Sequence, residues 1–180
     1  MSIELILGGA RSGKSAYAEQ QARESGCAVS VIVTAQPLDA EMAARIAHHR
    51  AHRPAHWRTV EAPLDLAAAL RAAAGADRFV IVDCLTLWAS NHLCATGQPE
   101  TDAPLDAWSA ARGELLKLLP QLDGAIALVS NEIGWGVVPM GAMTRRFVDE
   151  AGRLNQALAR CCDRVTLVAA GLPLTLKVGG

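Results

Sequence analysis

Five short apolar runs dominate the hydrophobic pattern of this chain. Their apolar residues are nearly continuous instead of alternating with polar ones, which is typical of strands covered on both faces. A further run near the C-terminus is expected to add an edge strand. The expected strands are residues 3–7, 28–34, 79–84, 125–130, 165–170 and, at the edge, 174–178.

Helix-forming stretches lie between these runs, and Gly26 follows the first of them at the position where helices commonly end. The alternation predicts an α/β fold with a mostly parallel sheet and helices on both faces. Neither a linker nor a repeat divides the chain, so residues 1–180 are expected to form a single domain, with an exposed loop at 96–104. The expected helices are residues 12–25, 39–53, 64–74, 85–94, 105–119 and 143–161.

Composition narrows the class of protein. The 180 residues are 51% hydrophobic, but much of this is alanine, and no apolar run approaches the roughly 20 residues of a membrane helix. The N-terminus lacks a basic leader, and five cysteines form no CxxC pair. We therefore expect a cytoplasmic protein with reduced thiols and no membrane span. The net charge of −1 argues against a dedicated nucleic-acid binder.

The first expected strand runs directly into a phosphate-binding motif. Residues 8–15 read GGARSGKS, which satisfies G-x-x-x-x-G-K-[ST] through Gly8, Gly13, Lys14 and Ser15. The glycines let backbone N–H groups turn towards phosphate oxygens, and the following helix points its positive end at the same anion. Lys14 is expected to bridge the β and γ phosphates, and Ser15 to bind Mg²⁺. The sequence therefore predicts a P-loop NTPase fold.

An acidic residue is also expected at the end of a neighbouring strand, because bound Mg²⁺–triphosphate commonly has such a partner. Asp83 closes the run FVIVD and fits this role. The alternative is an ordinary aspartate that caps the helix beginning near residue 85.

Four of the five histidines lie in the segment AHHRAHRPAHW at 47–57. On a helical wheel His49 shares the apolar side with Met42 and Ile46, whereas His48 lies on a polar face beside Arg45. Three readings compete: a solvated basic face, a metal site formed by His48 and His52, and covalent catalysis by an imidazole that attacks phosphorus. If the last reading holds, His48 is the better nucleophile.

Taken together, these motifs resemble the bifunctional adenosylcobinamide kinase / adenosylcobinamide-phosphate guanylyltransferase family, over nearly the whole chain. The resemblance includes the P-loop, residues 39–61, VDC at 82–84, SNEIGWGVVP at 130–139 and RLNQALA at 153–159. The histidine segment is its most specific part. One mild departure is TAQ at 34–36, where the family often has A-T-[SA].

The resemblance implies two reactions and a shared nucleotide site. A nucleoside triphosphate, ATP or GTP, phosphorylates adenosylcobinamide, and GTP then donates GMP to adenosylcobinamide phosphate through a guanylylated histidine, which corresponds to His48. A homotrimer and a recombinase-type P-loop fold are also implied. By this resemblance, catalysis would involve His48 and Lys14, and Mg²⁺ would bind Ser15 and Asp83. The nucleotide contacts would be Gly8, Gly9, Ala10, Arg11, Ser12, Gly13, Lys14, Ser15, Thr34, Ala35, Gln36, His49, Arg50, Ala51, His52, Glu61 and Asp83.

Two other functions remain open at this point. One is a P-loop kinase of another small molecule, with the histidines as a basic scaffold; the other is a nucleotide-dependent switch, which the lack of an N-K-x-D motif disfavours. Asn131 and Glu132, at the end of the fourth apolar run, invite a role in orienting Mg²⁺ or a hydroxyl group. For Arg145 and Arg146, substrate phosphate binding and an exposed helix start are equally plausible.

Overall fold

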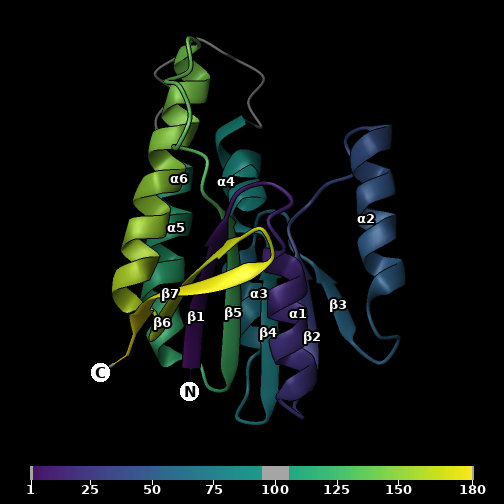
Figure 1. Ribbon diagram of the computed structural model, residues 1–180. Helices are drawn as coiled ribbons and strands as arrows, with labels where there is room; N and C mark the ends of the chain where they lie inside the picture. Colours follow the sequence, from purple (N-terminus) through teal and green to yellow (C-terminus); the bar gives the residue numbers. More distant parts are fainter. Residues whose placement is uncertain (1, 95–105, 180) are drawn as a thin grey trace.

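A seven-stranded sheet runs through the molecule (Figure 1), and the computed structural model describes residues 2–94 and 106–179. The strand order is β3-β2-β4-β5-β1-β6-β7. The loop predicted at 96–104 lies outside the described residues. The strands are β1 (Ser2–Gly8), β2 (Ala28–Val33), β3 (Arg58–Glu61), β4 (Arg78–Asp83), β5 (Ala125–Asn131), β6 (Arg164–Ala169) and β7 (Leu172–Val178).

Strands β1 to β6 pair in parallel, and β7 pairs with β6 in the antiparallel direction. This confirms the predicted mostly parallel sheet and its C-terminal edge strand. The sequence analysis missed β3, the edge strand beside β2. β3 has only four residues and none of them is buried, so it lacks the continuous apolar run that marks the other parallel strands.

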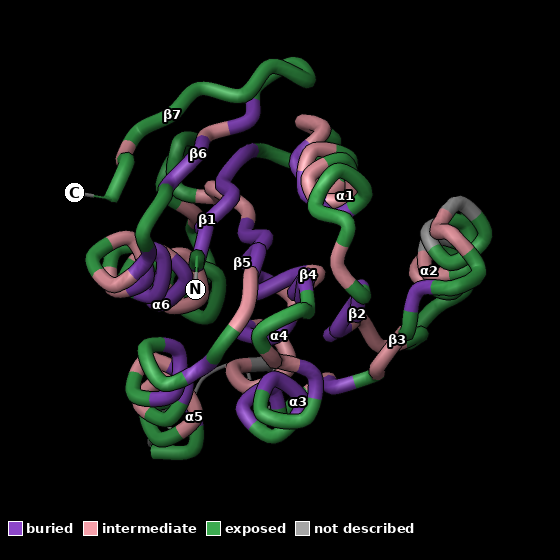
Figure 2. The backbone as a smooth tube through the Cα atoms, turned by 90° about the horizontal axis from the view of Figure 1, so that it is seen from below, coloured by how far each residue is buried: buried purple, intermediate pink, exposed green. Residues whose placement is uncertain are grey.

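Helices cover both faces of the sheet, as predicted (Figure 2). Helix α1 packs on one face against β1, β4 and β5, while α3, α4, α5 and α6 form a layer on the other face. Helix α2 stands apart from this body, beyond the β2–β3 end of the sheet (Figures 1 and 2). The helices are α1 (Lys14–Glu24), α2 (Ala40–His52), α3 (Leu66–Ala73), α4 (Leu85–Cys94), α5 (Asp106–Leu118) and α6 (Ala142–Cys161), with a 3₁₀ turn, η1 (Leu119–Gln121).

Each face of the sheet has its own apolar core. The larger core joins β1, β4 and β5 to helices α3 to α6 and contains Trp88 and Trp108, whose side chains are almost fully buried. The smaller core lies under α1 and contains Trp57. Within the described residues, no helix is both long and apolar enough to cross a membrane.

The carboxyl ends of β1, β4 and β5 meet at one edge of the sheet, because these neighbouring strands are parallel. The P-loop follows β1, Asp83 ends β4 and Asn131 ends β5. Ligands of open α/β sheets bind at this edge. Helix α1 begins at Lys14, two residues later than predicted, because Gly13 has a left-handed backbone with φ 98° that a helix cannot include.

Candidate nucleotide site

The P-loop holds Lys14 in a half-enclosed position at the start of α1. The residue is buried, and its Nζ donates a hydrogen bond to the carbonyl oxygen of Gly9 at 2.7 Å. Burial lowers the pKa of Lys14, and the Asp83 carboxylate offsets part of this effect. A desolvated ammonium group gains more from an anion than an exposed one does, so this lysine is suited to a phosphate ligand.

Ser12, in the middle of the loop, has a buried hydroxyl. Its Oγ has no hydrogen-bond partner within the described part of the chain, although Ser12 lines the cavity beside the P-loop. Buried hydroxyl groups are nearly always hydrogen-bonded, because an unpaired one costs about 1–3 kcal/mol. The loop therefore fits an anion whose oxygens would supply this hydroxyl with a partner.

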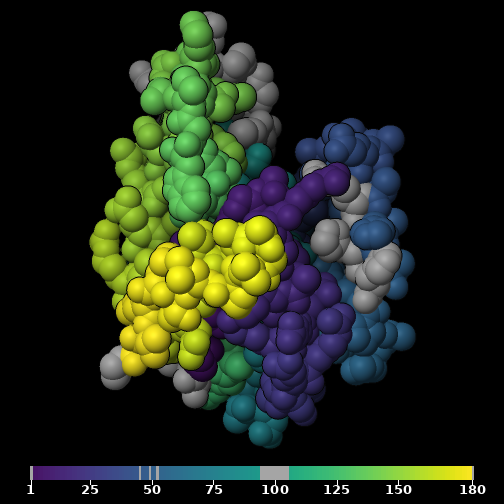
Figure 3. All heavy atoms as spheres, viewed as in Figure 1, coloured from purple at the N-terminus to yellow at the C-terminus, as the bar shows by residue number. Residues whose placement is uncertain are grey.

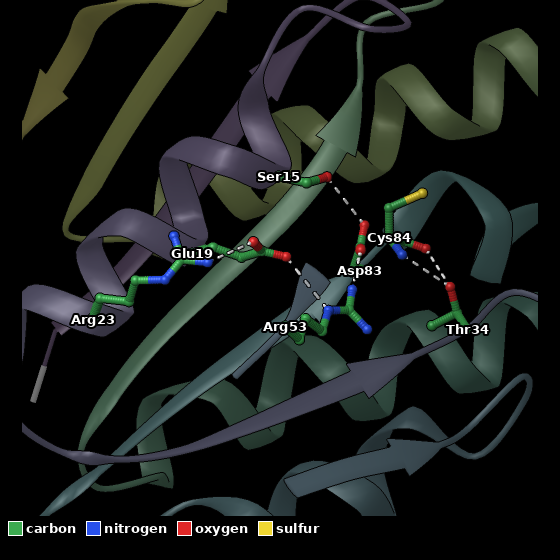
Figure 4. Close-up of polar contacts among 7 residues, drawn as sticks. All are labelled: Ser15, Glu19, Arg23, Thr34, Arg53, Asp83 and Cys84. Carbon is green, nitrogen blue, oxygen red and sulfur yellow. Dashed lines mark hydrogen bonds and ion pairs between the residues drawn. The ribbon is translucent and has the colours of Figure 1, made fainter. Parts of the chain in front are cut away.

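Asp83 lies opposite Ser15 at the end of β4. The Ser15 hydroxyl donates to Asp83 Oδ1 at 3.4 Å (Figure 4). The strand end is fixed by Thr34, whose hydroxyl donates to the Cys84 carbonyl oxygen at 2.7 Å and accepts from the Cys84 N–H at 3.0 Å. Mg²⁺ commonly takes only one or two protein ligands and fills the rest of its shell with phosphate oxygens and water. Ser15 and Asp83 therefore fit a Mg²⁺ site of this kind.

These residues surround a cavity of about 480 Å³. Figure 3 shows the molecule hollowed above the N-terminal residues, between α2 and the chain that follows β5. The buried thiol of Cys84 forms part of the wall, and burial followed by the Asp83 charge raises its pKa to about 11, so it is protonated at neutral pH. The lining residues are Ala10, Arg11, Ser12, Gly13, Lys14, Ser15, Ala16, Val33, Ala35, Met42, Ile46, Arg53, Asp83, Cys84, Leu87, Val129 and Asn131.

Helix α2 turns the apolar side that the helical wheel identified to this cavity, an orientation that the sequence did not predict. Met42 and Ile46 are half-buried and line the cavity, whereas His48 is exposed on another face. Asp39 caps the helix by accepting a hydrogen bond from the Met42 N–H at 2.7 Å. The structure therefore places the predicted nucleophile on the helix beside the cavity but outside the cavity wall.

Only some of the other predicted contacts lie around the cavity. Residues 10–15, Ala35 and Asp83 come together around the cavity. Among the described side chains, Thr34 is buried against Cys84, and the exposed Arg50 pairs with Glu61 at 3.0 Å away from the cavity wall. The side chains of His49 and His52 lie outside the described part of the structure. For all these residues, nucleotide binding stays a prediction.

Arg53 is a cavity residue that the sequence analysis did not single out. Its Nη2 donates to Asp83 Oδ2 at 2.7 Å and its Nε donates to Glu19 Oε1 at 3.4 Å (Figure 4). Its side chain is only 5% exposed. The one sequence signal was its place at the end of the histidine helix, immediately before Pro54.

Asn131 lines the cavity at the end of β5, and its N–H donates to the Thr86 hydroxyl at 2.7 Å. Glu132 instead accepts a hydrogen bond from Asn155 Nδ2 at 2.9 Å, which ties the chain after β5 to α6. Arg145 donates to the carbonyl oxygen of Pro139 at 3.0 Å and thus holds the loop before α6. Of Asn131, Glu132 and Arg145, Asn131 is the residue that lines the cavity.

Comparison with known proteins identifies the family. Residues 4–176 match the CobU family, described as cobinamide kinase / cobinamide phosphate guanyltransferase. The chain belongs to this family. The fold class, family and transferase activities expected from the sequence are thereby confirmed at the level of the family.

Relatives and solved structures agree with this assignment. The chain is 58% identical to the bifunctional adenosylcobalamin biosynthesis protein CobP of Pseudomonas aeruginosa, over 97% of this chain and 96% of the relative. It is 40% identical to the corresponding CobU protein of Salmonella typhimurium, over 96% and 98% of the two chains. The RadB recombinase structure has a TM-score of 0.50 at 16% identity, covering 92% of this chain and 73% of that one. At this identity the likeness concerns the fold alone, and it agrees with the expected recombinase-type P-loop fold.

Proposed function

We propose that this enzyme works as one catalytic domain, residues 1–180, that performs two transfers at a single phosphate site. In the first, the aminopropanol hydroxyl of adenosylcobinamide attacks the γ-phosphorus of ATP or GTP, and the β–γ bridging bond breaks to release the nucleoside diphosphate. Lys14 and the P-loop N–H groups hold the phosphates, supported by the buried position of Lys14 and the unpartnered Ser12 hydroxyl.

In the second transfer, a neutral ring nitrogen of His48 attacks the α-phosphorus of GTP and pyrophosphate leaves. A phosphate oxygen of adenosylcobinamide phosphate then attacks the histidine-bound GMP, which yields adenosylcobinamide-GDP and frees the imidazole. The observation that supports this step is the position of His48, exposed on the helix whose apolar side lines the cavity. Because the ring lies outside the cavity wall, α2 has to shift or turn to bring it to the nucleotide.

Mg²⁺ would bind Ser15 Oγ and Asp83 Oδ1, whose 3.4 Å separation already brings two oxygen ligands together. It would supply charge neutralisation to the phosphates. We also propose nucleotide contacts for Gly8 to Ser15, Thr34 to Gln36, His49 to His52 and Glu61. We further propose that the protein is a homotrimer and that it works in the cytoplasm, where triphosphates are available and thiols stay reduced.

The test is an intact-mass measurement after incubation with GTP and Mg²⁺. The wild-type protein should gain the mass of one GMP in an acid-labile, base-stable linkage, and His48→Ala should gain none while it still phosphorylates adenosylcobinamide. Lys14→Ala should lower both reactions by roughly tenfold or more, about 1.4 kcal/mol of transition-state stabilisation. Guanylylation that persists in His48→Ala would exclude His48 as the nucleophile. Kinase activity of the wild type without any adduct would favour a simple kinase.

A further inference from the structure

Arg53 joins two carboxylates from different elements at the base of the cavity. One edge of the guanidinium reaches Asp83 at the end of β4, and its Nε reaches Glu19 on α1 (Figure 4). The arginine side chain is 5% exposed, and those of Glu19 and Asp83 are 14% and 17% exposed. These pairs are therefore poorly screened by solvent, in contrast to the exposed pairs elsewhere on the surface.

The chain around Arg53 is also where α2 is attached to the body of the protein. Arg53 directly follows the last residue of α2. Four residues further on, Trp57 is buried in the apolar core under α1, with the Arg23 guanidinium 5.5 Å from its ring. The exposed body of α2 stands apart from the sheet (Figure 2). The C-terminal end of α2 is thus fixed, and His48 lies about 6 Å before the last helical residue, His52, along the helix axis, at about 1.5 Å per residue.

We propose that Arg53 is a positioning residue for guanylyl transfer: it sets the placement of α2, and hence of His48, relative to the Asp83 carboxylate. This inference rests on the proposed function. It gives Arg53 a part in the histidine step that the kinase step does not need, because only the former requires α2 to deliver a reacting group.

The two oxygens of Asp83 make this arrangement compatible with a metal ion. Oδ2 accepts from Arg53, while Oδ1 faces Ser15. A cation between Ser15 and Oδ1 would therefore leave the arginine contact in place. The Asp83 carboxylate therefore contacts the P-loop residue Ser15 through one oxygen and Arg53, at the end of α2, through the other.

Arginine suits this bridge because its planar group offers N–H donors in two directions. A lysine in its place would keep the positive charge, but its ammonium group could not reproduce the fork between Glu19 and Asp83. Arg53→Lys therefore separates the geometry of the bridge from its charge. Glu19→Ala removes the α1 side of the bridge and leaves the Asp83 contact of Arg53 untouched.

The experiment compares two rates in each variant: formation of the GMP–protein adduct from GTP, followed by intact mass, and phosphorylation of adenosylcobinamide. We expect Arg53→Lys to lower the adduct rate by roughly tenfold or more, since a misplacement of about 1 Å can cost on the order of 100-fold. Glu19→Ala should lower it by a smaller factor, about threefold or more, on the same geometric ground. Phosphorylation should fall by a smaller factor than adduct formation in both variants, because the P-loop that holds the triphosphate is unchanged. In Glu19→Ala it should stay within about twofold of wild type, because Glu19 lies outside the cavity lining.

Control variants with the same substitutions are available at two exposed residues. Arg71→Lys alters an exposed pair with Glu114, and Glu24→Ala removes an exposed glutamate from α1; both should keep the wild-type ratio of the two rates. Equal losses of both activities in Arg53→Lys and Glu19→Ala, or an unchanged adduct rate in both, would overturn the inference. Failure of the wild type to form any adduct would instead reject the proposed function itself, so the two failures are distinguishable.

Discussion

Gly8 is the position in the P-loop where an added methyl group has the least room. An ideal Cβ there would lie 2.4 Å from the carbonyl oxygen of Val168 and 2.5 Å from Ser12 Oγ. The serine side chain can move, but the Val168 oxygen belongs to the main chain of β6, which pairs with both β1 and β7. Gly8→Ala therefore forces a shift of the loop or the strand.

The cost follows from overpacking, which typically destabilises a folded protein by about 1–3 kcal/mol. A loss of about 2 kcal/mol lowers Tm by roughly 4–8 °C in a chain of this length. The assay is thermal unfolding by circular dichroism without nucleotide. Gly9→Ala is the matched control, because no heavy atom lies within 4 Å of its added Cβ. Both variants lose the same unfolded-chain entropy, so the difference between them isolates the contact. Equal Tm values for the two variants would refute this reasoning.

Two further expectations concern stability. Trp88 is 1% exposed, and its Nε1 donates to the Leu64 carbonyl oxygen at 2.8 Å. Trp88→Phe should therefore lower the free energy of unfolding, measured in urea, by about 2–4 kcal/mol. The control Trp135→Phe, at an exposed position, should leave this free energy unchanged. Burial alone would raise the pKa of Glu150, but hydrogen bonds from Trp108 and Arg153 and the charge of Arg112 lower it below its usual value of 4.5. The free energy of unfolding of the wild type should therefore decrease as the pH falls below about 4.5. This decrease should be smaller in Glu150→Gln, whereas Glu114→Gln should behave like wild type. The same pH dependence of unfolding in Glu150→Gln and wild type would contradict this prediction.

The sequence was sufficient for most of the sheet because its central strands are nearly continuous apolar runs. β3 could not be found this way, because an exposed edge strand of four residues owes its existence to pairing with β2 and not to its own pattern. The same limit applies to boundaries. Only the left-handed conformation of Gly13 shows why α1 starts at Lys14.

The candidate site was predictable where a motif determines local geometry and unpredictable where the contacts are long-range. The P-loop belongs to the first kind, since a strand end, a glycine-rich turn and a helix start are adjacent in the sequence. Asp83 lies 68 positions from Ser15 and was predicted from the general need of Mg²⁺–triphosphate for an acidic residue at a strand end. The bridge from Arg53 to Glu19 and Asp83 spans 34 and 30 positions. A single sequence gives no measure of such pairings, so nothing distinguishes Arg53 from the other residues of the histidine segment before the structure is known.

The exposure of α2 is consistent with the chemistry proposed for it. An isolated helix of this length is marginally stable in water. Among its described residues, Met42 and Ile46 line the cavity and the exposed Arg50 pairs with Glu61, and the buried Arg53 bridge follows its last turn. Two transfers at one phosphate site require two different groups to approach the nucleotide, a substrate hydroxyl at the γ-phosphorus and an imidazole at the α-phosphorus. A helix held mainly at one end can keep His48 outside the cavity during one proposed transfer and present it during the other, and the positioning role proposed for Arg53 would couple this movement to the nucleotide site.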